Sequence, residues 1–267
     1  MSVVILHGFT GDGSTMRALA DLVDPAAVVP DLAGHGAGPH STHPADYTVD
    51  AMADAVLALA GDRCDLVGYS MGGRVALNAA CRHPERVRSL TLIGASAGLA
   101  DADERRARAS ADDELAELVE QDLPAFVERW MANPLFATQS RLGDDYLSGA
   151  RAQRLGNDPI ALATSLRQAS AGRMAPLHDL LDRCTMPVGL IVGGDDAKFV
   201  GIAETLARRL PDAVIHTIDA AGHAAHLEDP TAVAEAVRHD RTGMSLDLIP
   251  YDLPLRSPMA TSHAIVA

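Results

Sequence analysis

Short apolar runs recur along the chain and alternate with longer segments whose apolar residues follow helical spacing. Runs of this length, bounded by turn residues, are typical of strands buried on both faces of a parallel sheet. The segment 47–60 instead has Val49, Met52, Ala53, Val56 and Leu59 near helical spacing, which predicts an amphipathic helix. This alternation predicts an open, mostly parallel α/β sheet flanked by helices. The expected strands are 3–6, 27–30, 65–67, 87–94, 187–192 and 213–218.

The pattern changes after residue 98, and no convincing strand is found before about residue 176. Helical spacing recurs in this region over 112–120, 124–131 and 144–155. An insert of this length after a strand of an α/β sheet is typical of a helical cap over a site. We therefore expect a core of residues 1–97 and 177–240, a cap of residues 98–176, and an irregular tail over 241–267.

Composition narrows the possible partners and location. A length of 267 residues suits one α/β domain with an inserted subdomain, and a net charge of −14 argues against nucleic acid or an anionic membrane as partner. The first apolar run is too short for a secretory signal, and no run is long enough to span a membrane. Cys64, Cys81 and Cys184 lack metal-ligand spacing and are predicted to be reduced, buried thiols. We expect a cytoplasmic protein without a metal, as a monomer or a weak homo-oligomer.

One motif organises the candidate chemistry. Gly68-x-Ser70-x-Gly72 lies between an apolar run and a helix-forming run, which is the strand, sharp turn and helix of a nucleophile elbow. The serine backbone in such a turn is strained, and small residues are needed on either side of it. The turn exposes the Ser70 hydroxyl and leaves the Met71 N–H at a helix N-terminus, where it can stabilise an oxyanion.

A second loop could complete an oxyanion hole. The run His7 to Gly11 follows the first expected strand and precedes a helix over 16–23, for which Ser14 is a possible N-cap. The Phe9 N–H would then be the second donor beside that of Met71. Taken without the elbow, the same loop is better explained as an ordinary glycine turn.

An acid and a base follow the serine in the chain order of an α/β-hydrolase triad. Asp196 follows the strand over 187–192 and is the expected acid, with Asp195 as the alternative. His223 lies in the last loop and is the expected base, whereas His226 is interpreted as a supporting or structural residue. Each group follows a strand that ends at the same edge of the sheet, which is where ligands bind in open α/β folds.

Arginines suggest what the substrate carries. Arg74 lies four residues after Ser70 on the expected helix, so it falls on nearly the same face one turn below the serine. A guanidinium buried there needs an anion, either in an internal salt bridge or from a substrate carboxylate. Converging cations in a chain of charge −14 favour a small substrate with several carboxylates. Further arginines in the cap are Arg105, Arg106, Arg108 and Arg151.

The sequence resembles a family of menaquinone-pathway lyases, the 2-succinyl-6-hydroxy-2,4-cyclohexadiene-1-carboxylate synthases of the α/β-hydrolase superfamily. The resemblance runs from residue 3 to about residue 239. Its most family-specific motifs are Arg74 after the double glycine, the Asn-Pro-Leu-Phe-Ala run and Asp-x-Lys-Phe. The matching pieces are His7-Gly8-Phe9-Thr10-Gly11, Asp31-Leu32-Ala33-Gly34-His35-Gly36, the run from Gly68 to Ala76, Trp130, Asn133-Pro134-Leu135-Phe136-Ala137, Asp196-Ala197-Lys198-Phe199 and the run from Ala221 to His226.

The resemblance implies an elimination of pyruvate without a cofactor or metal. It implies that Ser70, activated by His223 and Asp196, abstracts a ring proton, while the Phe9 and Met71 N–H groups meet the charge that develops on a carbonyl. Arg105 is the alternative to Arg108 at the cap position for a substrate carboxylate. The family's substrate-binding positions match Arg74, Arg108, Arg151, Tyr69 and Trp130.

Two other functions fit the same scaffold. A carboxylesterase or C–C bond hydrolase would use the same triad to form an acyl-enzyme, but it would leave Arg74 without a partner. A non-catalytic small-molecule receptor would bind its ligand without turnover, and an intact set of Ser70, Asp196 and His223 argues against it.

Overall fold

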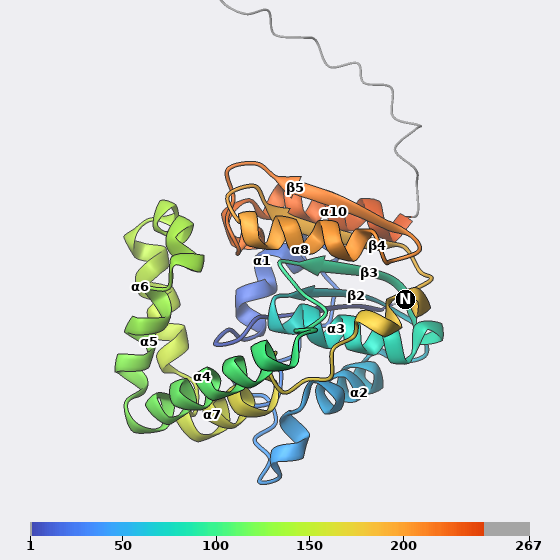
Figure 1. The fold of residues 1–267 in the computed structure, drawn as a ribbon. Coiled ribbons are helices and arrows are strands. Elements are labelled where there is room, and N and C mark those ends of the chain that lie inside the picture. Colours follow the sequence, from blue (N-terminus) through green and yellow to red (C-terminus); the bar gives the residue numbers. More distant parts are fainter. Residues whose placement is uncertain (1, 243–267) are drawn as a thin grey trace, which may run out of the picture.

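The computed structural model describes residues 2–242, and its centre is a single parallel sheet. The five strands pair in the order in which they occur along the chain, and every pairing is parallel (Figure 1). This confirms the predicted fold class, a mostly parallel sheet flanked by helices. The strands are β1 (Ser2–Leu6), β2 (Cys64–Tyr69), β3 (Val87–Ile93), β4 (Val188–Gly193) and β5 (Ala213–Ile218).

Helices bury both faces of the sheet, and successive strand residues alternate between two separate cores. Val4 and Leu6 of β1 pack on one face with α2 (Val49–Ala60), α3 (Met71–Arg82) and α8 (Ala197–Ala207). Val3 and Ile5 pack on the other face with α1 (Arg17–Val23) and α10 (Pro230–Thr242). Strands buried on both sides explain why the runs are wholly apolar.

A third apolar cluster is formed by the chain segment between β3 and β4, which is helical and contributes no strand to the sheet. Its helices are α4 (Ala102–Gln121), α5 (Leu123–Met131), α6 (Asp144–Leu155) and α7 (Pro159–Gln168), and in Figure 1 they lie to one side of the sheet. Phe126 and Leu162 are central to this cluster, and Phe9 packs against both it and one sheet core. The remaining short elements are η1 (Gly13–Met16), η2 (Pro44–Tyr47), η3 (Pro84–Arg86), η4 (Pro134–Leu142), η5 (His178–Arg183) and α9 (Ala225–Glu228).

The structure differs from the expected elements at the edge strand and in one helix. The segment 27–30 forms only an isolated parallel bridge from Val28 to Val4, because Pro30 has no N–H with which to continue the ladder. Leu59 is 60% exposed, and the buried stripe of α2 instead includes Leu57.

Two termini of helices also differ from the expectations. Asp12, not Ser14, supplies the N-cap, and it caps the short turn of η1 ahead of α1. Helix α10 continues to Thr242, so Arg241 is helical and donates to Asp65 at 2.8 Å. The rest of the expected tail, 243–267, lies outside the described residues.

Two composition-based expectations can be checked on the same part of the chain. Cys64, Cys81 and Cys184 are buried free thiols, as predicted. Over residues 2–242, none of the helices combines the length and the apolar character needed to cross a membrane.

Candidate active site

The turn between β2 and α3 holds Ser70 in a strained conformation. Ser70 has φ 51° and ψ −106°, a backbone region that non-glycine residues seldom occupy. Helix α3 begins at the next residue and approaches β1 closely, since a Cβ at Gly72 would lie 2.5 Å from the His7 carbonyl oxygen. The glycine spacing of the motif is therefore a packing requirement, and it presents the Ser70 hydroxyl at the carboxyl edge of the sheet.

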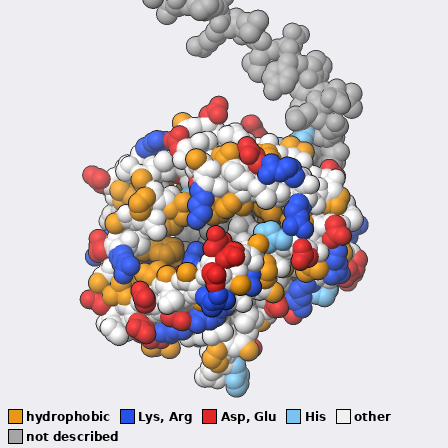
Figure 2. Space-filling view, in the orientation of Figure 1, with side chains coloured by type: hydrophobic (Ala, Val, Ile, Leu, Met, Phe, Trp, Pro, Cys, Tyr) orange, Lys and Arg blue, Asp and Glu red, His pale blue; other side chains and the backbone are white. Residues whose placement is uncertain are grey.

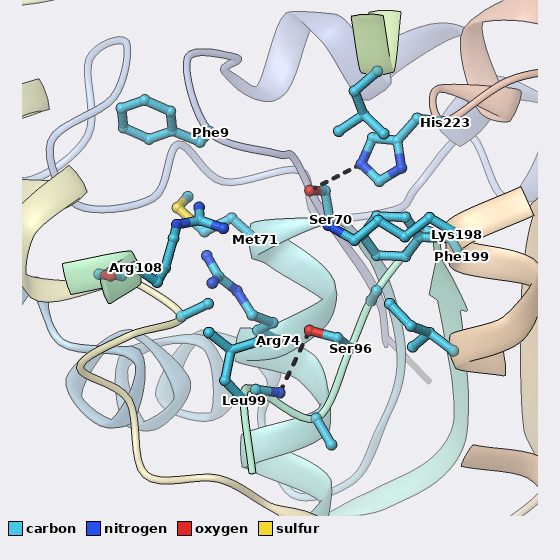
Figure 3. Close-up of a pocket in the computed structure, with 18 of the residues that line it drawn as sticks. Phe9, Ser70, Met71, Arg74, Ser96, Leu99, Arg108, Lys198, Phe199 and His223 are labelled. Atoms are coloured by element: carbon cyan, nitrogen blue, oxygen red, sulfur yellow. Dashed lines mark hydrogen bonds between the residues drawn. The ribbon is translucent and has the colours of Figure 1, made fainter. Parts of the chain in front are cut away.

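Ser70, His223 and Asp196 form a hydrogen-bonded row, of which Figure 3 shows the bond between Ser70 and His223. His223 Nε2 lies 3.3 Å from Ser70 Oγ, and His223 Nδ1 lies 2.8 Å from Asp196 Oδ2. Since a carboxylate can only accept, Nδ1 donates to Asp196 and Nε2 is left to accept the Ser70 proton. Asp195, the alternative acid, is bound instead to Arg141 at 2.8 Å on the surface.

The loop after β1 is fixed by a buried histidine. His7 Nδ1 donates to the Gly8 carbonyl at 2.8 Å, and Nε2 accepts from Leu32 N–H at 2.9 Å. Phe9, two residues after His7, lines the same cavity as Ser70 and Met71. Met71 is the first residue of α3, so its N–H has no partner within the helix. The two residues expected to supply oxyanion donors therefore line the cavity that holds Ser70.

The row opens into a cavity of about 470 Å³ lined by residues of both the sheet region and the α4–α7 region. Figure 2 shows a hollow on this face, bordered by hydrophobic and charged side chains. Trp130 and Phe136 come from the α4–α7 region, and Phe199, whose ring centroid lies 4.4 Å from that of His223, comes from α8. Near His223 the cavity is therefore lined by aromatic side chains together with Lys198.

Arg74 points into this cavity from α3, one turn after Ser70 (Figure 3). Burial, and next the nearby Arg108, lower the pKa of its guanidinium to about 10, while Asp112 opposes the shift. Within residues 2–242 the guanidinium makes no hydrogen bond or ion pair, so the internal salt bridge considered from the sequence is not formed there. A cation in this state is suited to an anionic ligand.

The other arginines are divided between the cavity and the surface. Arg108 lines the cavity and is held by Asp112, whereas Arg105 donates to the Leu99 and Ala100 carbonyls. Arg151 does not reach the cavity, because it is paired with Glu128 on the exposed side of α6.

Arg154, which the sequence reasoning missed, lines a second cavity of about 280 Å³ beside the first. Burial lowers the pKa of its guanidinium, and its buried Nε has no partner in the described part of the chain. Tyr69 and Trp130 line both cavities and join them, and the buried Trp130 indole N–H is also unpaired. The residues of α6 that line this cavity form one stripe at helical spacing, and Arg151 is not part of it. The stripe consists of Asp145, Tyr146, Gly149, Ala150, Gln153 and Arg154.

Across the described residues no group of three or more histidine, cysteine or carboxylate side chains is arranged to hold an ion. His226, interpreted from the sequence as structural, is buried with its ring 4.2 Å from that of Tyr69. The groups that line the two cavities include the hydrogen-bonded Ser70 and the guanidinium groups of Arg74, Arg108 and Arg154.

Buried neutral histidines predict a loss of stability in mild acid. Burial lowers the pKa of both His35 and His226 from 6.5 to about 3. Between these values the unfolded chain binds more protons, so the free energy of unfolding falls as the pH falls, by about 1.4 kcal/mol per unit for each ring. We expect urea denaturation at pH 7 and pH 5 to show a loss of about 4 kcal/mol from the two rings together.

A matched variant isolates one ring in that measurement. His226→Phe should keep the stacking on Tyr69 and remove about 2 kcal/mol of the stability lost between pH 7 and pH 5. Carboxylates with lowered pKa values, such as Asp65, titrate below this window and do not obscure it. Equal stability at pH 7 and pH 5 would show that these rings are protonated in the folded protein.

Comparison with known proteins agrees with the fold. The model of the alpha/beta hydrolase family matches residues 3–236. A protein of Enterobacter sp. named 2-succinyl-6-hydroxy-2,4-cyclohexadiene-1-carboxylate synthase is 34% identical over 235 residues, which cover 87% of this chain and 88% of that protein.

Solved structures give the same result. MenH from S. aureus superposes with a TM-score of 0.80 at 29% identity, covering 90% of this chain and 94% of that one. A thermophilic esterase from Thermogutta terrifontis, solved with malate bound, superposes with a TM-score of 0.75 at 26% identity, covering 90% of this chain and 88% of that one. The chain therefore belongs to the alpha/beta hydrolase family and, within it, to the family of 2-succinyl-6-hydroxy-2,4-cyclohexadiene-1-carboxylate synthases.

Proposed function

We propose that this protein is a lyase of menaquinone biosynthesis. It eliminates pyruvate from 2-succinyl-5-enolpyruvyl-6-hydroxy-3-cyclohexene-1-carboxylate to give 2-succinyl-6-hydroxy-2,4-cyclohexadiene-1-carboxylate. The observation that carries the proposal is the unpaired Arg74 guanidinium one turn below Ser70, in the same cavity. An esterase for neutral substrates has no use for this cation, whereas a substrate with several carboxylates does. The names of its relatives support the same reaction.

The bond changes follow from the two compounds. The ring double bond at C3 becomes double bonds at C2 and C4, and the substituent at C5 is lost, so the proton must leave C2. C2 carries the succinyl group, whose ketone can hold the electron pair as an enolate oxyanion. The pair then returns to form the diene as the C5–O bond breaks, and the leaving enolpyruvate takes up a proton to become pyruvate. The protein needs a base at C2 and donors at the ketone oxygen.

Ser70 can act as that base. His223 Nε2 can take the Ser70 proton while the serine oxygen takes the proton from C2, and Asp196 stabilises the resulting imidazolium. The N–H groups of Phe9 and Met71 are the donors for the developing oxyanion. No covalent bond to Ser70 forms, which distinguishes this reaction from ester hydrolysis on the same scaffold.

The cations are distributed to suit a tricarboxylate. The substrate has carboxylates on the ring, on the enolpyruvyl group and on the succinyl group. Arg74 and Arg108 can bind one of them in the main cavity. Arg154, with the unpaired Trp130 indole N–H, can bind another in the second cavity. In Figure 3, Arg74 and Arg108 lie on one side of Ser70, and the chain's single lysine, Lys198, lies on the other.

The proposal is tested by giving the purified protein two substrates. One is the enolpyruvyl substrate, generated in situ, with pyruvate release followed by a coupled dehydrogenase. The other is p-nitrophenyl acetate, a small neutral ester. We expect pyruvate release far above the spontaneous rate, with slow ester cleavage. Brisk ester cleavage with no added pyruvate release would establish a hydrolase instead, and binding of the enolpyruvyl substrate without turnover would establish a receptor.

A further inference from the structure

An acidic residue occupies the buried side of an otherwise exposed helix. The buried positions of α4 are Asp112, Ala116 and Val119, and the side chain of Asp112 is only 3% exposed. Burying a carboxylate costs several kcal/mol unless charged and hydrogen-bonding partners compensate it, and an apolar residue would fill such a position at no such cost. Packing alone therefore does not explain why an aspartate stands at this buried position.

Asp112 is bound from two directions. Arg108 Nε lies 2.9 Å from one carboxylate oxygen and 2.8 Å from the other. Ser170 Oγ donates to Asp112 Oδ2 at 2.6 Å and accepts from Gly172 N–H at 2.9 Å. Gly172 itself lies against α4, since a Cβ there would be 2.5 Å from the Arg105 carbonyl oxygen. The carboxylate is thus anchored between its own helix and the 170–172 loop.

This pairing occupies only one nitrogen of Arg108. Arginine commonly grips a carboxylate with two parallel N–H groups, but here Nε serves both oxygens of Asp112. The terminal nitrogens of Arg108 make no hydrogen bond with the rest of the described chain. Figure 3 shows the Arg108 guanidinium next to that of Arg74, and the two are close enough for Arg108 to lower the pKa of Arg74. Free donors of both arginines therefore face the same space.

The charges of this cluster balance only when one anion is added. Arg74 and Arg108 contribute two positive charges, and Asp112 contributes one negative charge that favours the protonated form of Arg74. Without Asp112 two like charges would share a partly buried site, which disfavours both. With it, the cluster carries one net positive charge, which a single carboxylate neutralises.

We infer that Asp112, supported by Ser170, is a positioning residue that orients Arg108 and leaves room beside Arg74 for one substrate carboxylate. This inference rests on the proposed function only in taking that carboxylate to belong to the tricarboxylate substrate. It predicts that loss of the Asp112 charge weakens binding of carboxylates rather than the chemical step.

The test compares neighbouring carboxylates on α4. In the full-length protein, Asp112→Asn should raise KM for pyruvate release by about 10-fold or more and change kcat by less than about 3-fold. The reason is that the charged hydrogen bond that orients Arg108 toward the substrate carboxylate is lost. Asp113→Asn is the matched control, since Asp113 pairs with Arg173 on the surface at 2.7 Å, and its KM should not change. Ser170→Ala keeps the charge and should raise KM by a smaller factor, about 3-fold.

A second measurement does not depend on the lyase reaction. Succinate should raise the thermal midpoint of the wild-type protein and of Asp113→Asn, and should raise that of Asp112→Asn much less. If the wild type releases no pyruvate but this difference in succinate response is found, the proposed function fails and the role of Asp112 stands. Equal KM values and equal succinate shifts in the two Asn variants would overturn the inference, as would a parallel loss of kcat without a change in KM.

Discussion

Replacing Ser70 with alanine is expected to lower the rate of pyruvate release by about 10³-fold while the fold is retained. Ser70 Oγ is the group that His223 Nε2 can activate, at 3.3 Å, and no other hydroxyl is bonded to that nitrogen in the described part of the chain. Positioned general bases contribute on the order of 10²–10⁴ in rate, so losing the base removes most of the acceleration. Single-turnover measurement of pyruvate release, with far-UV circular dichroism as a check on folding, would show the effect.

The neighbouring residues Asp195 and Asp196 provide a matched pair of variants for the hydrogen-bonded row of Ser70, His223 and Asp196. Asp196→Asn should slow pyruvate release by a comparable factor, because Asp196 fixes the Nδ1–H tautomer of His223 and stabilises the imidazolium. Asp195→Asn removes only a surface ion pair with Arg141 and should leave the rate unchanged. A Ser70→Ala variant with near-wild-type pyruvate release would exclude the serine as the base.

Residues whose role depends on local backbone geometry could be predicted from the sequence. The elbow needs small residues around Ser70 because α3 and β1 come within contact distance there, and this requirement shows directly in the Gly-x-Ser-x-Gly spacing. The acid and the base each follow a strand of the same parallel sheet, so the chain order alone brought Asp196 and His223 to one edge. The place of Arg74 in the cavity followed from its position one turn after the serine, whereas the sequence left open whether an internal salt bridge would pair it.

Positions that depend on how the α4–α7 region packs could not be fixed in the same way. The sequence shows that 144–155 is helical, but which face of α6 meets the cavity depends on its contacts with neighbouring elements. Resemblance placed Arg151 in the site, whereas the stripe from Tyr146 to Arg154 shows that Arg154 faces inward. Helix α7 was missed, although the pair Asp158-Pro159 carries an N-cap and a proline in the first turn.

The arginine beneath the serine is expected to separate activity from stability. Arg74→Met should lower kcat/KM for pyruvate release by about 100-fold, because a guanidinium that grips a carboxylate is lost. The same change should raise the free energy of unfolding by about 1–3 kcal/mol, since an unpaired, partly buried cation is replaced by an apolar side chain of similar length. Coupled pyruvate assays and urea denaturation at pH 7 measure the two effects on one sample.

Helix α3 also supplies the control for this prediction. Arg82, in the last turn of the same helix, is paired with Asp54 at 2.9 Å on the surface. Arg82→Met should leave pyruvate release unchanged and lower stability by less than about 1 kcal/mol. If Arg74→Met were instead destabilised and fully active, Arg74 would have to be a structural cation with a partner in the folded protein. A gain of stability together with a loss of turnover in Arg74→Met would show that the Arg74 charge destabilises the fold and serves to bind the substrate.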